Sequence, residues 1–304
     1  MSVLPGTGIS VTHFSLPIQR FGQKEFHTLL WVKQNPNFAS LILAQGFAKL
    51  PSLINFQSIN SVLNRLNTYR EKYKIRSSEV ATDGKAKLQS ICDLLQETAG
   101  NHALKLNFDI SQLKEQNLTW MLHRLHVIMD RFPGWRDEIT IKTWPSSGDS
   151  LRAYRDFVIM DADGEEIGRC LSYWLMINIE TRRPVRMPEE VLKMAPADTK
   201  HVLEVQKNRI DFDIEAEGSS EFRVRRSDLD LNHHLNNVAY IEWALEALPA
   251  ERRVRKIDIE FLAECTEGEE VKSEYAESKP KSNEHFHRII RKSDNKVSAR
   301  AISS

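Results

Sequence analysis

An internal repeat constrains the fold of this chain more than any other feature. Residues 73–99 align without a gap to residues 222–248 at a constant offset of 149. In both copies the first residues alternate between apolar and charged, which predicts a half-buried strand. A turn-like stretch follows, and apolar residues then recur at helical spacing. The second helix is apolar on nearly every side and should be deeply buried.

Short alternating segments follow each helix and predict antiparallel strands. In the first copy they are residues 125–131, 138–144, 151–160 and 167–179, and in the second copy residues 257–261, 270–275, 285–291 and 296–302. One strand, one buried helix and four more strands describe a sheet wrapped around a central helix, an α+β fold. The alternative is two unrelated α+β domains with a common supersecondary pattern, which a gap-free register over 27 residues disfavours.

The chain of 304 residues is long enough for two units that each bury a core. We expect an N-terminal extension of unknown role over residues 1–70, a first unit with linker over 71–200 and a second unit over 201–304. Glu25 is the only acidic residue of the extension. This acid-poor composition is typical of organelle transit peptides, although a poorly ordered extension fits equally well.

Composition excludes several functions. Lys plus Arg and Asp plus Glu both total 42, so the overall charge does not point to a nucleic-acid partner. Three cysteines without C-x-x-C spacing argue against a disulfide framework or a zinc site. No apolar run approaches the roughly 18 residues of a membrane span. We therefore expect a soluble cytoplasmic protein without a cofactor.

The two copies differ in their polar residues. At the offset of 149 the second copy has Asp230, Asn232 and His234 where the first has Ala81, Asp83 and Lys85. After the helix, Glu138 aligns with Glu270 at an offset of 132, which places Glu264 and Cys265 opposite Phe132 and Pro133. The residues capable of chemistry thus collect in the second copy.

Their spacing predicts how they could act. Asp230, Asn232 and His234 are two residues apart, so an extended backbone would aim all three side chains to the same side. Backbone N–H groups near Asn236 and Asn237, at the start of the helix, could stabilise an oxyanion, and a histidine beside carboxylates can act as a general base. Other interpretations stay open. Asp230 and Asn232 could cap the helix or hold a turn, and Cys265 could be a small strand residue.

The run RSDLDLNHHLNNVAYI, residues 226–241, resembles the signature of the acyl-ACP thioesterases of plant plastids and bacteria. Similar matches occur at residues 94–99, 118–121, 130–135, 144–145, 181–184 and 264–265. The resemblance covers the chain from Tyr73 to its end. It implies a tandem hotdog fold that holds the acyl chain mainly in the first unit. By motif position it implies the catalytic residues Asp230, Asn232, His234, Glu264 and Cys265.

The implied activity is hydrolysis of fatty acyl-ACP thioesters, for which two mechanisms fit. Either His234 activates Cys265 to form an acyl-enzyme, or Glu264 or His234 activates a water molecule. We favour water, because a thioester already has a good leaving group and nearby carboxylates oppose thiolate formation. The connection between His102 and Leu118 is short, which resembles the bacterial members of the family more than the plant ones. We therefore expect the cytoplasm as the location and keep the plastid as the alternative.

The implied partner is acyl carrier protein, which is acidic and should dock on a basic face. The candidate basic clusters are Arg223, Arg225 and Arg226, residues 181–186, and Arg252, Arg253, Arg255 and Lys256. Two fused units already form the usual hotdog pair, so a monomer is as acceptable as a homodimer. Three other classes remain: an acyl-CoA thioesterase, a dehydratase acting on 3-hydroxyacyl thioesters without Cys265, and a non-catalytic acyl-binding protein.

Overall fold

The computed structural model describes residues 67–195, 200–249, 253–278 and 283–304. The first unit contains β1 (Tyr69–Lys74), α4 (Leu88–Lys105), α5 (Ile110–Lys114), β2 (Leu118–Met129), β3 (Glu138–Gly148), β4 (Arg152–Met160) and β5 (Glu166–Asn178). The second contains β7 (Gly218–Arg223), α7 (Asn237–Glu246), β8 (Lys256–Phe261), β9 (Glu270–Glu277), β10 (His285–Arg291) and β11 (Lys296–Ser303). Most of the expected extension lies outside the described residues.

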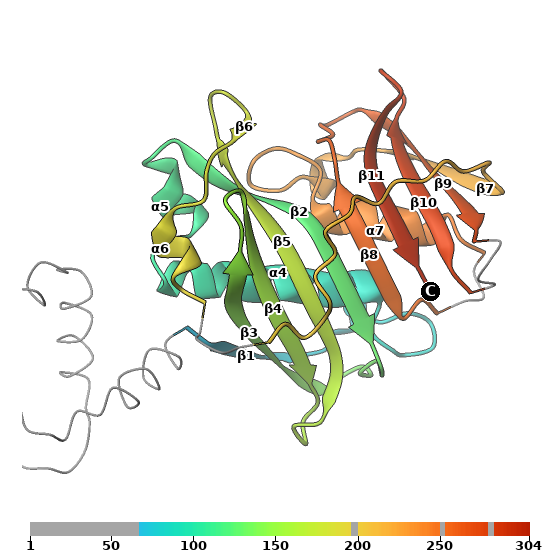
Figure 1. Cartoon of the computed structure of the whole chain (residues 1–304). Helices are drawn as coiled ribbons and strands as arrows, with labels where there is room; N and C mark the ends of the chain where they lie inside the picture. The colour runs from blue at the N-terminus through green and yellow to red at the C-terminus, as the bar shows by residue number, and fades with distance from the viewer. Residues whose placement is uncertain (1–66, 196–199, 250–252, 279–282) are drawn as a thin grey trace, which may run out of the picture. The chain divides into compact units, whose positions relative to one another are not determined.

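All these strands belong to one antiparallel sheet in the order β1-β3-β4-β5-β2-β8-β11-β10-β9-β7 (Figure 1). The order within the second unit repeats that within the first, read outward from the centre. The units join where β2 pairs with β8, and this pairing is centred on His126 opposite Asp258. These two residues are related by the offset of 132, so the junction has the self-complementary pattern of a two-fold contact.

Equivalent elements begin and end at equivalent residues. β1 and β7 have bounds related by 149, and α4 and α7 begin at Leu88 and Asn237, which differ by the same offset. Each copy also has a short 3-10 helix before its turn, Ser77–Glu79 in the first and Arg226–Asp228 in the second. The duplication expected from the sequence is confirmed.

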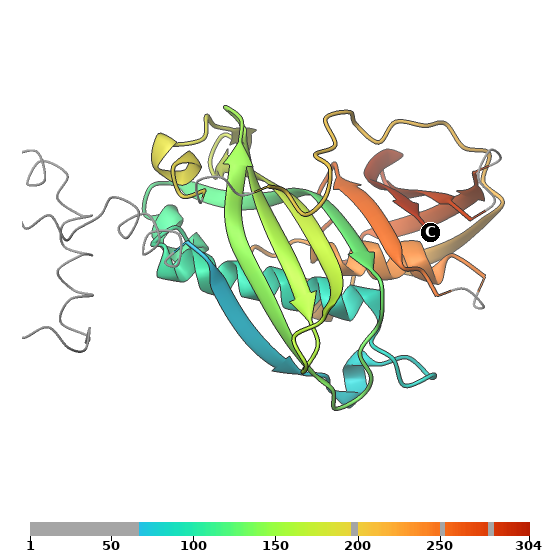
Figure 2. The ribbon, with the colours of Figure 1, turned by 60° about the horizontal axis from the view of Figure 1, so that its bottom comes forward.

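The two central helices lie on one side of the sheet (Figures 1 and 2). They contact each other and contribute to one hydrophobic core that extends through both units. Ile91 and Leu95 of α4 and Ile241 of α7 are fully buried. Trp243 stacks on Phe222 of β7 with ring centroids 5.0 Å apart. The expected burial of the second helix is confirmed.

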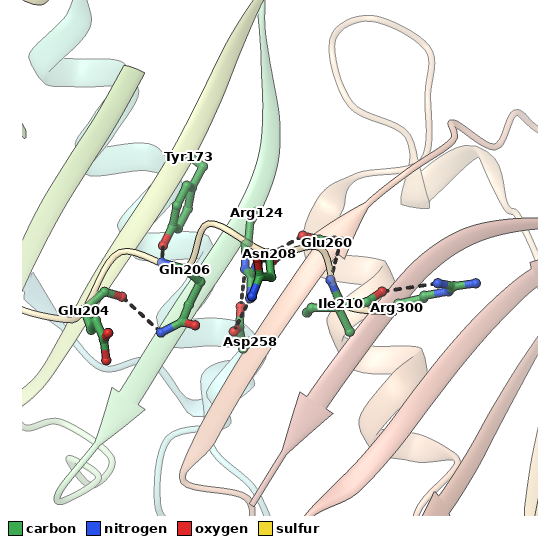
Figure 3. A network of polar contacts seen from close by, with 9 residues as sticks. All are labelled: Arg124, Tyr173, Glu204, Gln206, Asn208, Ile210, Asp258, Glu260 and Arg300. Carbon is green, nitrogen blue, oxygen red and sulfur yellow. Dashed lines mark hydrogen bonds and ion pairs between the residues drawn. The ribbon is translucent and has the colours of Figure 1, made fainter. Parts of the chain in front are cut away.

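The connection between the units crosses the opposite face of the sheet (Figure 3). It contains β6 (Arg183–Pro184) and α6 (Glu189–Leu192), and its described residues 200–217 form neither helix nor strand. Leu203 and Val205 pack on an outer cluster that includes Tyr173, whose hydroxyl accepts a 2.7 Å hydrogen bond from the Gln206 N–H. Residues 200–217 form a strap across this face of the sheet.

Buried charges fix the strap to the junction. Arg124 of β2 pairs with Asp258 at 2.6 Å and with Glu260 at 2.9 Å, both on β8, and donates to the Asn208 carbonyl at 2.7 Å. Glu260 also accepts from the Ile210 N–H at 3.0 Å. Each buried charge therefore has a partner, as low-dielectric surroundings require.

Some element bounds differ from expectation. β2 begins at Leu118 rather than at residue 125, because Leu118 and Trp120 are covered by α5, an element the sequence analysis did not include. Trp120 donates its indole N–H to the Phe108 carbonyl at 2.7 Å. β1 begins at Tyr69, two residues before the expected start of the first unit. Among the described residues, no helix is long and apolar enough to cross a membrane.

Candidate active site

Residues 230–234 form a tight turn before α7. The Asp230 N–H donates to the His234 carbonyl at 2.7 Å, and the His233 N–H donates to the Asp230 carbonyl at 3.1 Å. Asp230 Oδ1 accepts from the N–H groups of Asn232 (2.8 Å) and His234 (3.1 Å). The extended backbone expected from the spacing is therefore wrong, and the alternative in which Asp230 holds a turn is confirmed.

Most N–H groups at the start of α7 donate hydrogen bonds to nearby residues of the chain. Asn236 caps the helix by accepting from the Val238 N–H at 3.0 Å, and its own N–H donates to the Asp228 carbonyl at 2.9 Å. The N–H of Asn237, the first helical residue, has no acceptor among the described residues. Of the two amides expected to face the site, Asn237 is the one left to bind a ligand oxygen.

Three charged or titratable side chains meet beside this turn. His234 Nε2 lies 3.4 Å from Glu264 Oε2 and 3.4 Å from Arg182 Nη2. Arg182 also forms an ion pair with Glu264. The His234 side chain is 21% exposed and that of Glu264 41%, so the cluster is open to substrate.

Arg182 comes from the first unit, just beyond the end of β5, where its N–H donates to the Asn178 carbonyl at 2.9 Å. The sequence places Arg182 in a basic docking cluster and in the family-like run of residues 181–184, but does not predict it in the site. The pair that it forms with Glu264 joins residues 82 positions apart, and no local pattern marks such a contact.

The electrostatics keep His234 neutral. Burial lowers the pKa of the imidazole first, and the positive charge of Arg182 lowers it further, while Asp230 acts in the opposite direction. A neutral imidazole has a lone pair that can accept a proton, and on Nε2 this lone pair faces the Arg182 guanidinium.

Cys265 lies on the core side of the site. The residue is 0% exposed, and its Sγ is 3.4 Å from Ser298 Oγ. Its carbonyl accepts from the Leu235 N–H at 2.8 Å, which attaches the turn to the loop between β8 and β9 that carries Glu264 and Cys265. The structure thus brings His234 and Glu264 into contact, Asp230 and Asn232 into the turn, and Cys265 beneath it.

The first unit has the same turn without this chemistry. The Ala81 N–H donates to the Lys85 carbonyl at 2.8 Å, and Asp83 Oδ1 accepts from the Lys85 N–H at 3.0 Å. Arg253 of the second unit pairs with Asp83. The Pro133 carbonyl accepts from the Ala86 N–H at 2.8 Å, as Cys265 does from Leu235. This correspondence confirms the alignment at an offset of 132.

Two observations limit what else the site could hold. Within the described ranges, no group of three or more His, Cys, Asp or Glu side chains could hold a metal ion. A cavity of about 510 Å³ lies beside the strap, between Arg152, Tyr173 and Gln206. Neither His234 nor Glu264 lines it, so this cavity is separate from the cluster.

Comparison with known proteins identifies the family. Residues 66–195 match the acyl-ACP thioesterase N-terminal domain, and residues 212–304 match the acyl-ACP thioesterase C-terminal domain. The chain belongs to the acyl-ACP thioesterase family. The resemblance found in the sequence is confirmed, and with it the tandem hotdog fold.

Two Arabidopsis thaliana proteins are among the relatives. The chain is 33% identical to oleoyl-acyl carrier protein thioesterase 2, chloroplastic, over 68% of this chain and 62% of that protein. It is 30% identical to oleoyl-acyl carrier protein thioesterase 1, chloroplastic, over 76% of this chain and 69% of that protein. The matched region thus spans under two thirds of the former's length.

Solved structures agree with the fold. An acyl-ACP thioesterase from Bacteroides thetaiotaomicron superposes with a TM-score of 0.71 at 26% identity, covering 79% of this chain and 98% of that one. The 12:0-ACP thioesterase from Umbellularia californica has a TM-score of 0.69 at 24% identity, covering 78% and 96%, and supports the fold alone.

Proposed function

We propose that the protein hydrolyses fatty acyl-ACP thioesters, releasing free fatty acid and acyl carrier protein, at one site in the second unit. The main support for this proposal is the contact between His234 and Glu264, close to the N-terminus of α7. The chain's membership of the acyl-ACP thioesterase family is the second support. The first unit has Lys85 and Phe132 at these two positions and so lacks a second site.

In the proposed mechanism, water is the nucleophile. His234 Nε2 accepts a proton as the water oxygen attacks the thioester carbonyl, and later returns it to the departing thiolate. The Asn237 N–H stabilises the oxyanion. Glu264, held by Arg182, orients the water, Asn232 orients the carbonyl, and Asp230 holds Asn232 and His234 in the turn.

The burial of Cys265 supports water over a cysteine nucleophile. A nucleophilic thiol must reach the carbonyl carbon, and reactive thiols are found in partly exposed, electropositive surroundings. Cys265 instead belongs to the hydrophobic core, with Ser298 as its side-chain partner. We therefore assign Cys265 to packing and to holding the turn through its carbonyl.

The basic run of residues 181–186 is the proposed docking face for acyl carrier protein. Arg182 reaches the site itself, and Arg183 and Arg186 are exposed beside it. Arg225 and Arg226 are also exposed and follow β7. In contrast, Arg253 pairs with Asp83 at the turn of the first unit. The acyl chain would then enter the first unit.

Hydrolysis assays on a chain-length series of acyl-ACPs, with matched acyl-CoAs, test this function. We expect kcat/KM on acyl-ACP to exceed that on acyl-CoA, with free thiol released. Preference for CoA would select the acyl-CoA thioesterase, dehydration of 3-hydroxyacyl thioesters would select the dehydratase, and binding without turnover would select the acyl-binding protein.

Compartment and assembly are part of the proposal. The chloroplastic relatives favour a plastid over the cytoplasm expected above, with the residues before β1 as the candidate transit peptide. Fusing these residues to a fluorescent protein tests the location. Arg182 and His234 of the site come from one chain, so a monomer is sufficient for activity. Light scattering measures the oligomeric state of the protein.

A further inference from the structure

A second group of chemically capable side chains lies on the outer face of the first unit, where the strap meets the sheet. Ser147 Oγ lies 2.9 Å from His201 Nε2, and His201 Nδ1 lies 2.8 Å from Asp156 Oδ2. Ser147 is the extra residue of a bulge in β3, Asp156 lies on β4, and His201 begins the strap. No local sequence pattern predicts a role for any of them.

The hydrogen bonds fix the tautomer of His201. Asp156 is fully buried, and its second oxygen accepts from the Val202 N–H at 2.8 Å, so both carboxylate oxygens act as acceptors. His201 Nδ1 therefore donates to Asp156, and in the neutral form of the ring the Nε2 lone pair faces the Ser147 hydroxyl. This is the order of partners that activates a serine nucleophile.

The solvent exposure of the three side chains increases from Asp156 to His201 to Ser147, and a serine nucleophile must be accessible to its substrate. Asp156 is 0% exposed, the His201 side chain is 22% exposed, and Ser147 is open to solvent. The Tyr154 ring meets the imidazole edge-on with centroids 5.8 Å apart and limits its rotation. The nucleophile is thus accessible while its base is held.

Two buried donors beside the group have no hydrogen-bond partner in the part of the chain that the structure describes. They are Trp144 Nε1 and Ser146 Oγ, on residues that are 7% and 5% exposed. Trp144 pairs with Asp156 and Ser146 with Tyr154 in the β3–β4 ladder, so all four side chains share one face. Both atoms are shielded from solvent, so neither is available to a substrate at Ser147.

We propose that Ser147, His201 and Asp156 form a second, serine-type esterase site for small carboxylic esters that reach it from solvent. Ser147 Oγ bonds to the ester carbonyl carbon while its proton passes to His201 Nε2. The ester C–O bond then breaks, and the proton leaves with the alcohol. Water, deprotonated by the same imidazole, hydrolyses the acyl-serine and restores the hydroxyl.

Labelling of the full chain with a fluorophosphonate, followed by peptide mapping, tests the site. We expect one adduct, on Ser147, which disappears in Ser147→Ala and forms on the order of a hundredfold more slowly in Asp156→Asn. Ser150→Ala, which changes a neighbouring exposed serine, should label as the unaltered protein does. Circular dichroism and melting temperature establish that each variant is folded.

Hydrolysis of p-nitrophenyl acetate separates this site from the proposed thioesterase. Turnover should fall by on the order of a hundredfold in Ser147→Ala and persist in His234→Ala. The proposal is overturned if native protein gives no adduct on Ser147, if folded Asp156→Asn labels at the unaltered rate, or if ester turnover depends on His234 instead. In those cases the group only attaches the strap to the sheet.

Discussion

At the scale of single residues, the ionisation of His234 decides whether the site can accept a proton. Burial and the Arg182 charge lower its pKa, so the neutral form persists to lower pH. Arg182→Ala removes that charge and leaves the Glu264 carboxylate unpaired beside the imidazole, and both changes raise the pKa. The acid limb of the kcat/KM profile should move to higher pH, whereas Arg183→Ala should leave it in place. An unmoved limb in Arg182→Ala contradicts this role.

Cys265 provides a second test at the residue scale. If water attacks, Cys265→Ala removes only a buried sulfur, so kcat should stay within a few-fold while the free energy of unfolding falls by about 1–2 kcal/mol. His234→Ala should lower kcat by on the order of a hundredfold or more. Mass spectrometry after rapid quenching shows whether an acyl group forms on Cys265. An acyl group found on Cys265, together with an inactive Cys265→Ala variant, would show that the thiol is the nucleophile.

At the scale of elements, the turn before α7 has a single side-chain acceptor, Asp230 Oδ1, for two of its N–H groups. Asp230→Asn keeps a carbonyl oxygen at this position, so activity and stability should be largely retained. Asp230→Ala leaves two N–H groups unsatisfied and should lower the free energy of unfolding by about 1–3 kcal/mol, with a clear loss of kcat. Urea unfolding and steady-state kinetics measure both. Equal loss of activity in the two variants would assign Asp230 a charge-dependent catalytic role instead.

The sequence predicted the repeated strand, turn and helix because each has a local pattern that the duplication displays twice. It did not predict the turn conformation, since the spacing of Asp230, Asn232 and His234 fits an extended strand equally well. No local pattern predicted that Arg182 reaches the site or that the Ser147 group forms. Both arise from contacts between segments whose pairing depends on the path of the linker.

At the scale of the whole molecule, the two units are held together by β2–β8 pairing and by the buried charges of Arg124, Asp258 and Glu260. Arg124→Ala leaves two buried carboxylates without their cation and should lower the free energy of unfolding by about 3–5 kcal/mol. Arg300→Ala breaks a partly exposed pair with Asp211 and should cost under about 1 kcal/mol. Similar losses in denaturant unfolding would contradict a special role for the junction.

Of two structurally equivalent turns, only the one in the second unit is proposed to perform thioester hydrolysis. The most direct measurement is kcat/KM on acyl-ACP for the unaltered protein, His234→Ala and Lys85→Ala, which change equivalent positions in the two units. We predict that His234→Ala falls by on the order of a hundredfold or more while Lys85→Ala stays within a few-fold. Comparable losses in both variants, or full activity in His234→Ala, would contradict the account.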